Sequence, residues 1–265
     1  MIRLTWRQFR TRAAVGLGLL LVYAAFVIAT GIHGEHSNPQ SLSSTVLDLV
    51  RAGVAVPFLL GMFWGAPLLG EEYEGGTTKL VWTQGISRRK WLTVKIFVVL
   101  LAAGVYGAAF AALYTWWLHA NQLSASRFQS FDFDLDGIVP IFYSMFAVAL
   151  GVALGAWRRR TLVAVGATLV IFAIFRGAVP TYVRPYYMKP VTLTYTRDPK
   201  QSSTPAFLAA QEPGNWLVAT HGVDEIVYQP GNRYWEFQGI EAAIYLGLTT
   251  IAVGATYRIV VKRDA

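Results

Sequence analysis

The chain contains no cysteine and little charge. The absence of cysteine from its 265 residues excludes disulfides, thiolate metal sites and cysteine nucleophiles. Charged residues make up 14% of the chain, whereas about 25% is usual in a soluble domain. The deficit comes from several long stretches that hold no charge at all, which is the pattern of membrane-spanning helices.

Six uncharged stretches approach the length of about 20 residues that a helix needs to cross a bilayer. They are residues 13–30, 52–70, 96–118, 137–157, 161–175 with an extension over 177–179, and 242–257. Arg176 interrupts the fifth, and we expect its long side chain to snorkel to the interface. The sequence thus predicts an all-α polytopic membrane protein with six transmembrane helices. A cleaved signal peptide over the first stretch is the less favoured alternative, because the run is long and no clear cleavage site follows it.

The basic residues predict the orientation of these spans. Most of the 23 Lys and Arg residues precede the first span, follow the second, fourth and sixth, and so fall on one side of the membrane. The positive-inside rule places that side, with both termini, in the cytoplasm of an inner (plasma) membrane protein. Because the basic residues lie close to the membrane edges, the net charge of +8 indicates lipid headgroups and not nucleic acid.

The sequence lacks the motifs for nucleotide binding, for zinc-dependent hydrolysis and for ion-coupled transport. The chain has no Gly-x-x-x-x-Gly-Lys-Ser/Thr loop for nucleotide phosphates and no His-Glu-x-x-His zinc motif. The six cores lack the ionisable residue that a proton- or sodium-coupled transporter places at the midplane. We therefore expect no catalytic residue, no metal site and no cofactor bound by this chain. A weak metal site at His33, Glu35 and His36 is less favoured than ordinary solvated loop histidines.

The segments outside the spans divide the chain further. Residues 1–12 alternate apolar and basic side chains and predict an interfacial helix before spans one to five over 13–179. Residues 180–241 are rich in proline and carry short β-like runs at 191–196 and 215–220, which predict a small irregular and β cap outside the membrane. Residues 242–265 form the sixth span and the tail. Asp132, Asp134 and Asp136 resemble the start of a calcium loop, but its twelfth position is Tyr143, so we expect a solvated acidic rim.

Glycine and proline predict close packing and bending within the spans. Gly61 with Gly65, and Gly151 with Gly155, have the four-residue spacing that lets helices approach closely. With 24 glycines in the chain this signal is weak. Pro57 predicts a kink in the second span.

The loop after the second span is the most informative segment. It begins with Glu71, Glu72 and Glu74, and a glycine pair then allows a tight turn. Thr77 is placed to cap a short helix through Trp82, and Ser87 to cap the helix that becomes the third span. The acidic residues are expected on an exposed surface, where their replacement would change folding little.

This loop resembles the permease subunits of the type-2 ABC exporter family, which have an acidic residue before Gly-Thr, a short amphipathic helix, and then Thr-Pro-x-Ser-Arg leading into the third span. Gln84 replaces the usual proline. The six-span layout matches too, and the Trp-Thr-Gln variant with the 229–238 run resembles an actinobacterial subgroup. The matching and flanking positions expected to couple to the ATPase are Glu71, Glu72, Glu74, Gly76, Thr77, Thr83, Ser87, Arg88, Trp91 and Lys95.

The resemblance implies a transport mechanism and a set of partner subunits. Residues 71–95 would hold a cytoplasmic coupling helix that docks on an ATPase subunit, present in two copies and carrying ATP and Mg. A second permease half, identical or homologous, would complete a path for export or efflux of an amphipathic drug, antibiotic, peptide or lipid. The aromatic residues we select as candidates for the path are Phe58, Phe63, Trp64, Tyr106 and Phe110. The alternatives are a membrane scaffold or immunity protein, or an ion-coupled transporter without an ATPase.

Overall fold

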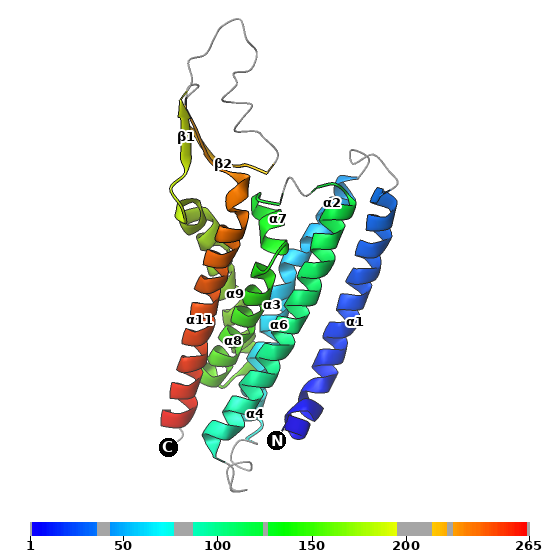
Figure 1. Ribbon diagram of the computed structural model, residues 1–265. Coiled ribbons are helices and arrows are strands. Elements are labelled where there is room, and N and C mark those ends of the chain that lie inside the picture. Colours follow the sequence, from blue (N-terminus) through cyan, green and yellow to red (C-terminus); the bar gives the residue numbers. More distant parts are fainter. Residues whose placement is uncertain are drawn as a thin grey trace, which may run out of the picture.

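Six long helices form the body of the protein in a computed structural model, which describes residues 2–35, 43–76, 87–123, 127–194, 214–221 and 225–263 (Figure 1). Within these residues, six helices have the length and apolar character to cross a membrane: Phe9–Ile32, Ser44–Glu74, Arg88–Ala120, Val139–Arg158, Thr161–Tyr186 and Gly231–Val261. The prediction of an all-α, six-span protein is confirmed. Both marked chain ends lie at one end of the bundle, the terminal end, and the small sheet lies at the other, the sheet end (Figure 1).

The first two spans differ in regularity. Helix α1 is continuous over Ile2–Glu35, so the expected interfacial residues belong to the same helix as the first span; whether they lie among headgroups stays a prediction. The second span is a series: α2 (Ser44–Arg51), the 3-10 helix η2 (Ala52–Ala55), α3 (Val56–Leu60), the π-helix η3 (Gly61–Gly65) and α4 (Ala66–Glu74). Pro57 and Pro67 stand in the first turns of α3 and α4. Each lacks an N–H and interrupts the regular hydrogen-bond ladder. The second span is thus irregular around Pro57, where a kink was predicted, and also around Pro67, which the sequence analysis did not name.

The remaining helices begin and end at residues with a local physical reason. Helix α6 (Arg88–Ala120) starts where Ser87 Oγ accepts a hydrogen bond from the Lys90 N–H, as the sequence predicted. Helix α8 (Val139–Arg158) has proline in its first turn and ends at Arg159, whose φ is +54°. Helix α9 (Thr161–Ala178) continues through the π-helix η5 (Val179–Val183) and the 3-10 helix η6 (Arg184–Tyr186).

Helix α8 is the centre of the bundle, and small residues put it there. It packs against α11, α6, α4, η3 and α9, and 72% of its apolar window is buried, compared with 17% for the first span. A methyl group added at Gly65 would come within 2.5 Å of the Val148 carbonyl oxygen, and one at Gly151 within 2.5 Å of the Gly61 carbonyl. The two four-residue glycine spacings therefore meet each other, and Gly155 continues the contact against the Ala66 carbonyl.

The sheet end carries a three-stranded antiparallel sheet in the order β1-β3-β2 (Figure 1). Its strands are β1 (Val191–Thr194), β2 (Trp216–His221) and β3 (Glu225–Gln229), with Leu193 opposite Ile226 and an irregularity in β2 at Leu217 to Ala219. The first two strands fall on the two predicted β-like runs. After the 3-10 helix η7 (Gly231–Arg233), helix α11 (Tyr234–Arg263) begins well before residue 242, the predicted start of the sixth span, and so includes the aromatic residues Tyr234, Trp235 and Phe237.

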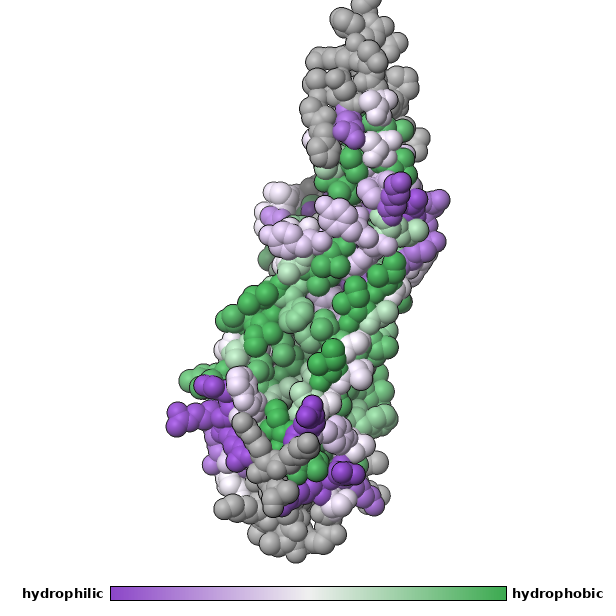
Figure 2. Space-filling view, turned by 90° about the vertical axis from the view of Figure 1, so that its left-hand side faces the viewer, coloured by the Kyte–Doolittle hydropathy of each residue, from purple (hydrophilic) through white to green (hydrophobic). Residues whose placement is uncertain are grey.

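The surface is zoned as a bilayer requires. Figure 2 shows a hydrophobic belt across the middle of one face, with hydrophilic residues gathered toward both ends. Many large apolar side chains in the spans are exposed, among them Val22 of α1 and Leu162 of α9. Hydrocarbon can cover such a belt at no cost, whereas water cannot, so the zoning supports a multi-pass membrane protein.

Candidate functional site

The last turn of α4 lies at the terminal end and carries the acidic residues that the sequence singled out. Glu71 accepts a hydrogen bond and ion pair from Arg12 of α1, and Glu72 accepts one from Lys95 of α6. Glu74 accepts from the backbone N–H of Thr161 at 3.0 Å and from its hydroxyl at 2.7 Å. Because Thr161 is the first residue of α9, a single turn of α4 is bonded to three other spans.

Lys95 of the Glu72–Lys95 pair is buried and the Glu72 side chain is only 15% exposed, which differs from the expected exposed surface. Lys95 is only 3% exposed, and its ammonium lies 4.8 Å from the ring centroid of buried Trp91. Taking an ammonium out of water is costly unless a carboxylate is close to it, and Glu72 supplies that charge. The expected exposed surface is therefore wrong at Glu72, and because its carboxylate partners a buried ammonium we now expect its replacement to affect folding more than a surface substitution would.

The other predicted coupling residues lie around this turn. Gly76 ends it with a φ of +66°, a left-handed conformation that favours glycine, and a side chain at Gly76 would meet open space. Arg88 and Trp91 stand in the first turns of α6, just after the Ser87 cap. Thr77, Thr83 and the short helix expected through Trp82 lie outside the described residues. The structure brings Glu72, Trp91 and Lys95 together, whereas Glu71 and Glu74 face α1 and α9.

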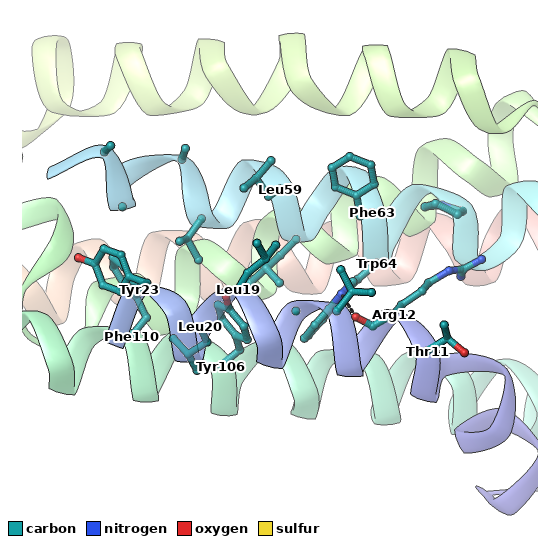
Figure 3. Close-up of a pocket in the computed structure, with 18 of the residues that line it drawn as sticks. Thr11, Arg12, Leu19, Leu20, Tyr23, Leu59, Phe63, Trp64, Tyr106 and Phe110 are labelled. Carbon is teal, nitrogen blue, oxygen red and sulfur yellow. Dashed lines mark hydrogen bonds between the residues drawn. The ribbon is translucent and has the colours of Figure 1, made fainter. Parts of the chain in front are cut away.

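A groove of about 640 Å³ runs along α1 and contains four of the five path candidates. Figure 3 shows its lining residues from Arg12 to Tyr23 along α1, and Leu59 and Phe63 on the second span also line it. Its full lining is Thr11, Arg12, Val15, Gly16, Leu19, Leu20, Tyr23, Leu49, Ala52, Gly53, Ala55, Val56, Leu59, Leu60, Phe63, Trp64, Pro67, Glu71, Tyr106 and Phe110. Phe58 is the exception among the candidates, because it points to the other side of its helix and packs on Phe172 at 4.7 Å between ring centroids.

Trp64 forms the floor of this groove. Its indole N–H donates to the Arg12 carbonyl at 3.2 Å, and its ring meets Phe9 and Tyr106 edge to face at 5.0 and 5.6 Å. Toward the sheet end, the Tyr23 hydroxyl donates to the Val50 carbonyl at 3.0 Å. The Trp64 N–H and the Tyr23 hydroxyl are thus bonded within the protein, so these two residues contribute mainly apolar ring surface to the cavity.

Sequence reasoning missed the wall that α1 contributes to the groove. Val15, Leu19 and Leu20 lie in an uninterrupted apolar run, so periodicity does not show which side of this helix faces another. The nearest signal was Gly16, since an added methyl there would collide with the Trp64 ring. A glycine opposite an aromatic residue is only visible once the two helices are placed side by side.

A second acidic cluster lies at the sheet end, on helix α7 (Ser130–Leu135) and the residue after it. Asp132 accepts from Arg51 Nε at 3.0 Å, from Arg51 Nη2 at 2.9 Å and from the Tyr114 hydroxyl at 2.7 Å. Asp136 accepts from the Thr115 hydroxyl and from the Tyr234 hydroxyl. These aspartates are buried, so the predicted solvated rim is wrong.

Asp134 is the middle member of this cluster and belongs to a buried charge network. It accepts from Arg176 at 2.8 Å and from Arg184 at 2.5 Å, and Arg184 also donates to Glu241 at 2.7 and 2.8 Å. The Tyr143 hydroxyl lies between the two carboxylates and donates to Glu241. Burial opposes ionisation of Asp134, but the two guanidiniums outweigh it and lower the pKa of that carboxyl. The network holds two carboxylates and two guanidiniums, which balance in charge.

Arg176 shows why this network escaped the sequence analysis. Its side chain was expected to snorkel to the membrane interface, but it is 9% exposed, points into the bundle and lies 4.0 Å above the Tyr143 ring. Its partner Asp134 comes from a segment between two other spans. The only signal in the sequence was the alternation of aspartates with apolar residues, which fits a solvated rim and a buried helix equally well.

A family model described as ABC-2 membrane transporter related matches residues 35–184. The chain belongs to this family. The match covers more than half of the chain, from the last residue of α1 to the first residue of η6, and so includes the acidic turn of α4 and one wall of the groove. No curated protein and no solved structure matches the chain. The chain is therefore an ABC transporter membrane subunit, a permease that is not itself catalytic, and its actinobacterial character stays a prediction.

Proposed function

We propose that the chain is one permease half of an ATP-driven exporter, with the terminal end in the cytoplasm and residues 71–95 as the site that receives motion from an ATPase subunit. The observation that carries this proposal is the bonding of the last α4 turn to α1, α6 and α9. A partner that displaces this turn pulls on three spans at once. Membership of the family is the reason to expect an ATPase partner. The hydrogen bonds of the last α4 turn are the contacts through which its motion would reach the spans.

The groove is the proposed starting point of the transport path. Glu71 lies both in the last turn of α4, which we call the coupling turn, and in the groove lining, and Arg12 on α1 is its partner. Movement of the turn therefore changes the position of α1 against the second span, which are the two walls of the groove. A second permease half, identical or homologous, would complete the path, and alternating access would carry an amphipathic molecule outward.

Buried carboxylates would also suit an ion-coupled transporter, the rival mechanism. Asp134 and Glu241 lie within the bundle, which the sequence did not predict. Each is held by a guanidinium, however, and the lowered pKa of Asp134 keeps that carboxyl ionised at neutral pH. A proton carrier must exchange its proton in each cycle, so this arrangement favours a fixed structural role and leaves ATP as the energy source.

The deciding experiment compares two loops at the terminal end. Lys79→Ala with Thr83→Ala changes the segment proposed to dock, and Arg158→Ala with Arg160→Ala changes the loop between α8 and α9 as a matched control. We expect the first variant to lose co-purified ATPase and cargo-stimulated hydrolysis, and the control to keep both. Equal yield and thermal unfolding establish that both variants fold. Full assembly and export by the first variant would show that residues 71–95 are only a loop that sets topology.

A further inference from the structure

Two cavities at the terminal end share one ion pair in their linings. Arg12, Pro67 and Glu71 line both the apolar groove and a smaller cavity of about 240 Å³. Phe9, Leu68, Glu72 and Lys95 complete the smaller cavity. The Arg12–Glu71 pair therefore stands where an apolar space meets a charged one. A molecule that fills both spaces has an apolar body and a polar head at this pair.

The apolar space has the size and opening of a ligand site. Its volume of about 640 Å³ falls within the range of about 300–1,000 Å³ for small-molecule pockets. Leu19, Leu59 and Phe63 line it and are also exposed, so the groove opens sideways to the surroundings of the spans. A ligand can thus enter from the hydrocarbon without crossing the bundle.

Close contacts keep this groove narrow. Methyl groups added at Gly16 and Gly53 would collide with the rings of Trp64 and Phe110, so α1 and η2 already lie against these rings. All four residues line the groove. A body with one apolar chain suits a slot bounded in this way better than a body with two.

The charged space has no net charge. Arg12 and Lys95 face Glu71 and Glu72, and the four groups form two pairs. The Lys95 and Glu72 side chains are 4% and 15% exposed, whereas those of Arg12 and Glu71 are 27% and 54% exposed and so more accessible to a ligand. A head with a single charge would satisfy one member of this pair and compete with the other. A head that carries both charges satisfies both.

We infer that the groove binds a single-chain amphiphile with a zwitterionic head, whose cationic group lies at Glu71 and whose anionic group lies at Arg12. The inference rests on the proposed function only in treating this molecule as cargo. Binding separates the Arg12–Glu71 pair and so loosens α1 from the coupling turn. Binding in the groove would in this way change the position of residues 71–95, the segment proposed to contact the ATPase.

The test measures binding to the purified full chain in an uncharged detergent, without any ATPase. The probes share one acyl chain length: a lysophosphatidylcholine, a lysophosphatidylglycerol, a monoacylglycerol and an alkyltrimethylammonium. A two-chain phosphatidylcholine distinguishes bilayer lipid from a single-chain amphiphile. We expect the lysophosphatidylcholine to bind about threefold to fivefold more tightly than each of the others, the upper factor that corresponds to one partly exposed charge pair.

Three variants locate the head. Glu71→Gln leaves Arg12 and shifts the preference to lysophosphatidylglycerol, whereas Arg12→Gln leaves Glu71 and shifts it to the alkyltrimethylammonium. The exchange Arg12→Glu with Glu71→Arg restores the preference for the zwitterion. Arg158→Gln, at the same end but outside both cavities, is the matched control and should change nothing.

A fourth variant locates the body. Leu59→Trp fills the groove and should weaken all single-chain probes alike. The inference is overturned if the order of head groups stays the same in both single variants, if the monoacylglycerol or the two-chain lipid binds as tightly as the lysophosphatidylcholine, or if Leu59→Trp has no effect. These results are independent of ATPase co-purification, so failure of this inference and failure of the proposed function are distinguishable.

Discussion

The protein has two acidic triplets, one at each end of the bundle, and they are used in the same geometric way. Glu71, Glu72 and Glu74 bond the end of α4 to α1, α6 and α9. The triplet on and after α7, Asp132, Asp134 and Asp136, bonds that segment to the second span and to α6, α8, α9, η6 and α11. Each triplet makes one short segment the meeting point of several spans.

Burial separates the two triplets. All three aspartates at the sheet end are buried, with Asp132 at 0% exposure, whereas Glu71 and Glu74 at the terminal end are exposed. A buried carboxylate that loses its partner keeps its full desolvation cost, and an exposed one regains water. The sheet end should therefore be a fixed closure, and the terminal end a set of contacts that a partner can rearrange.

Removing Arg184 should have the largest effect. Arg184→Ala removes the guanidinium that pairs with both Asp134 and Glu241 and so leaves a net negative charge inside the bundle. This should lower the free energy of unfolding by about 3–5 kcal/mol. Thermal unfolding and yield in detergent measure this loss. The control is Arg89→Ala, an exposed position, which should stay within about 0.5 kcal/mol of the unaltered chain. Equal effects of the two variants would contradict the view of a closed sheet end.

Glu72→Gln should have the next largest effect, and it tests the Glu72–Lys95 pair at the terminal end, in which Lys95 is buried. Lys95 would then lack its carboxylate, and we expect the free energy of unfolding to fall by about 1.5–3 kcal/mol. Lys95→Met with Glu72→Leu should recover most of that loss, because no charge remains buried. If the double variant is less stable than Glu72→Gln, the pair contributes more than the apolar contacts that replace it.

Glu71→Gln should have a small effect on stability. Its pair with Arg12 is partly exposed, and such pairs contribute about 0–1 kcal/mol. The same change should alter the distance between α1 and the second span, which a pair of spin labels on Val22 and Leu49 would report. A large loss of stability without any change in distance would make Glu71 a structural residue like Asp134.

Acidification should have the smallest effect within the physiological range. The pKa of Asp134 is lowered in the folded protein, so its contribution to stability is fully present above the ordinary value of 3.8 and is lost as the pH falls through the lower folded value. We expect thermal stability to be insensitive to Asp134 between about pH 5 and 8. A comparison of the unaltered chain with Asp134→Asn across this range checks the expectation, and a difference that grows from pH 8 to pH 5 would oppose it.

The sequence by itself determined the spans and several of their ends. Length and absence of charge are properties of a continuous segment, and a bilayer selects for them directly, so six helices were visible without any tertiary information. Ser87 at the start of α6 and the glycine pair after Glu74 were equally readable, because caps and turns depend on neighbouring residues. The acidic turn of α4 was identified for the same reason.

Only the tertiary structure decided what those residues touch. Arg176, Arg184 and Glu241 are separated from Asp134 by 42 to 107 positions along the chain, and nothing local indicates that they meet. The groove likewise needs α1 beside the second span, and an apolar helix without a polar face carries no mark of its neighbour. Local chemistry fixes where helices begin and end, whereas charge pairing and cavity shape arise from contacts between segments that are distant in sequence.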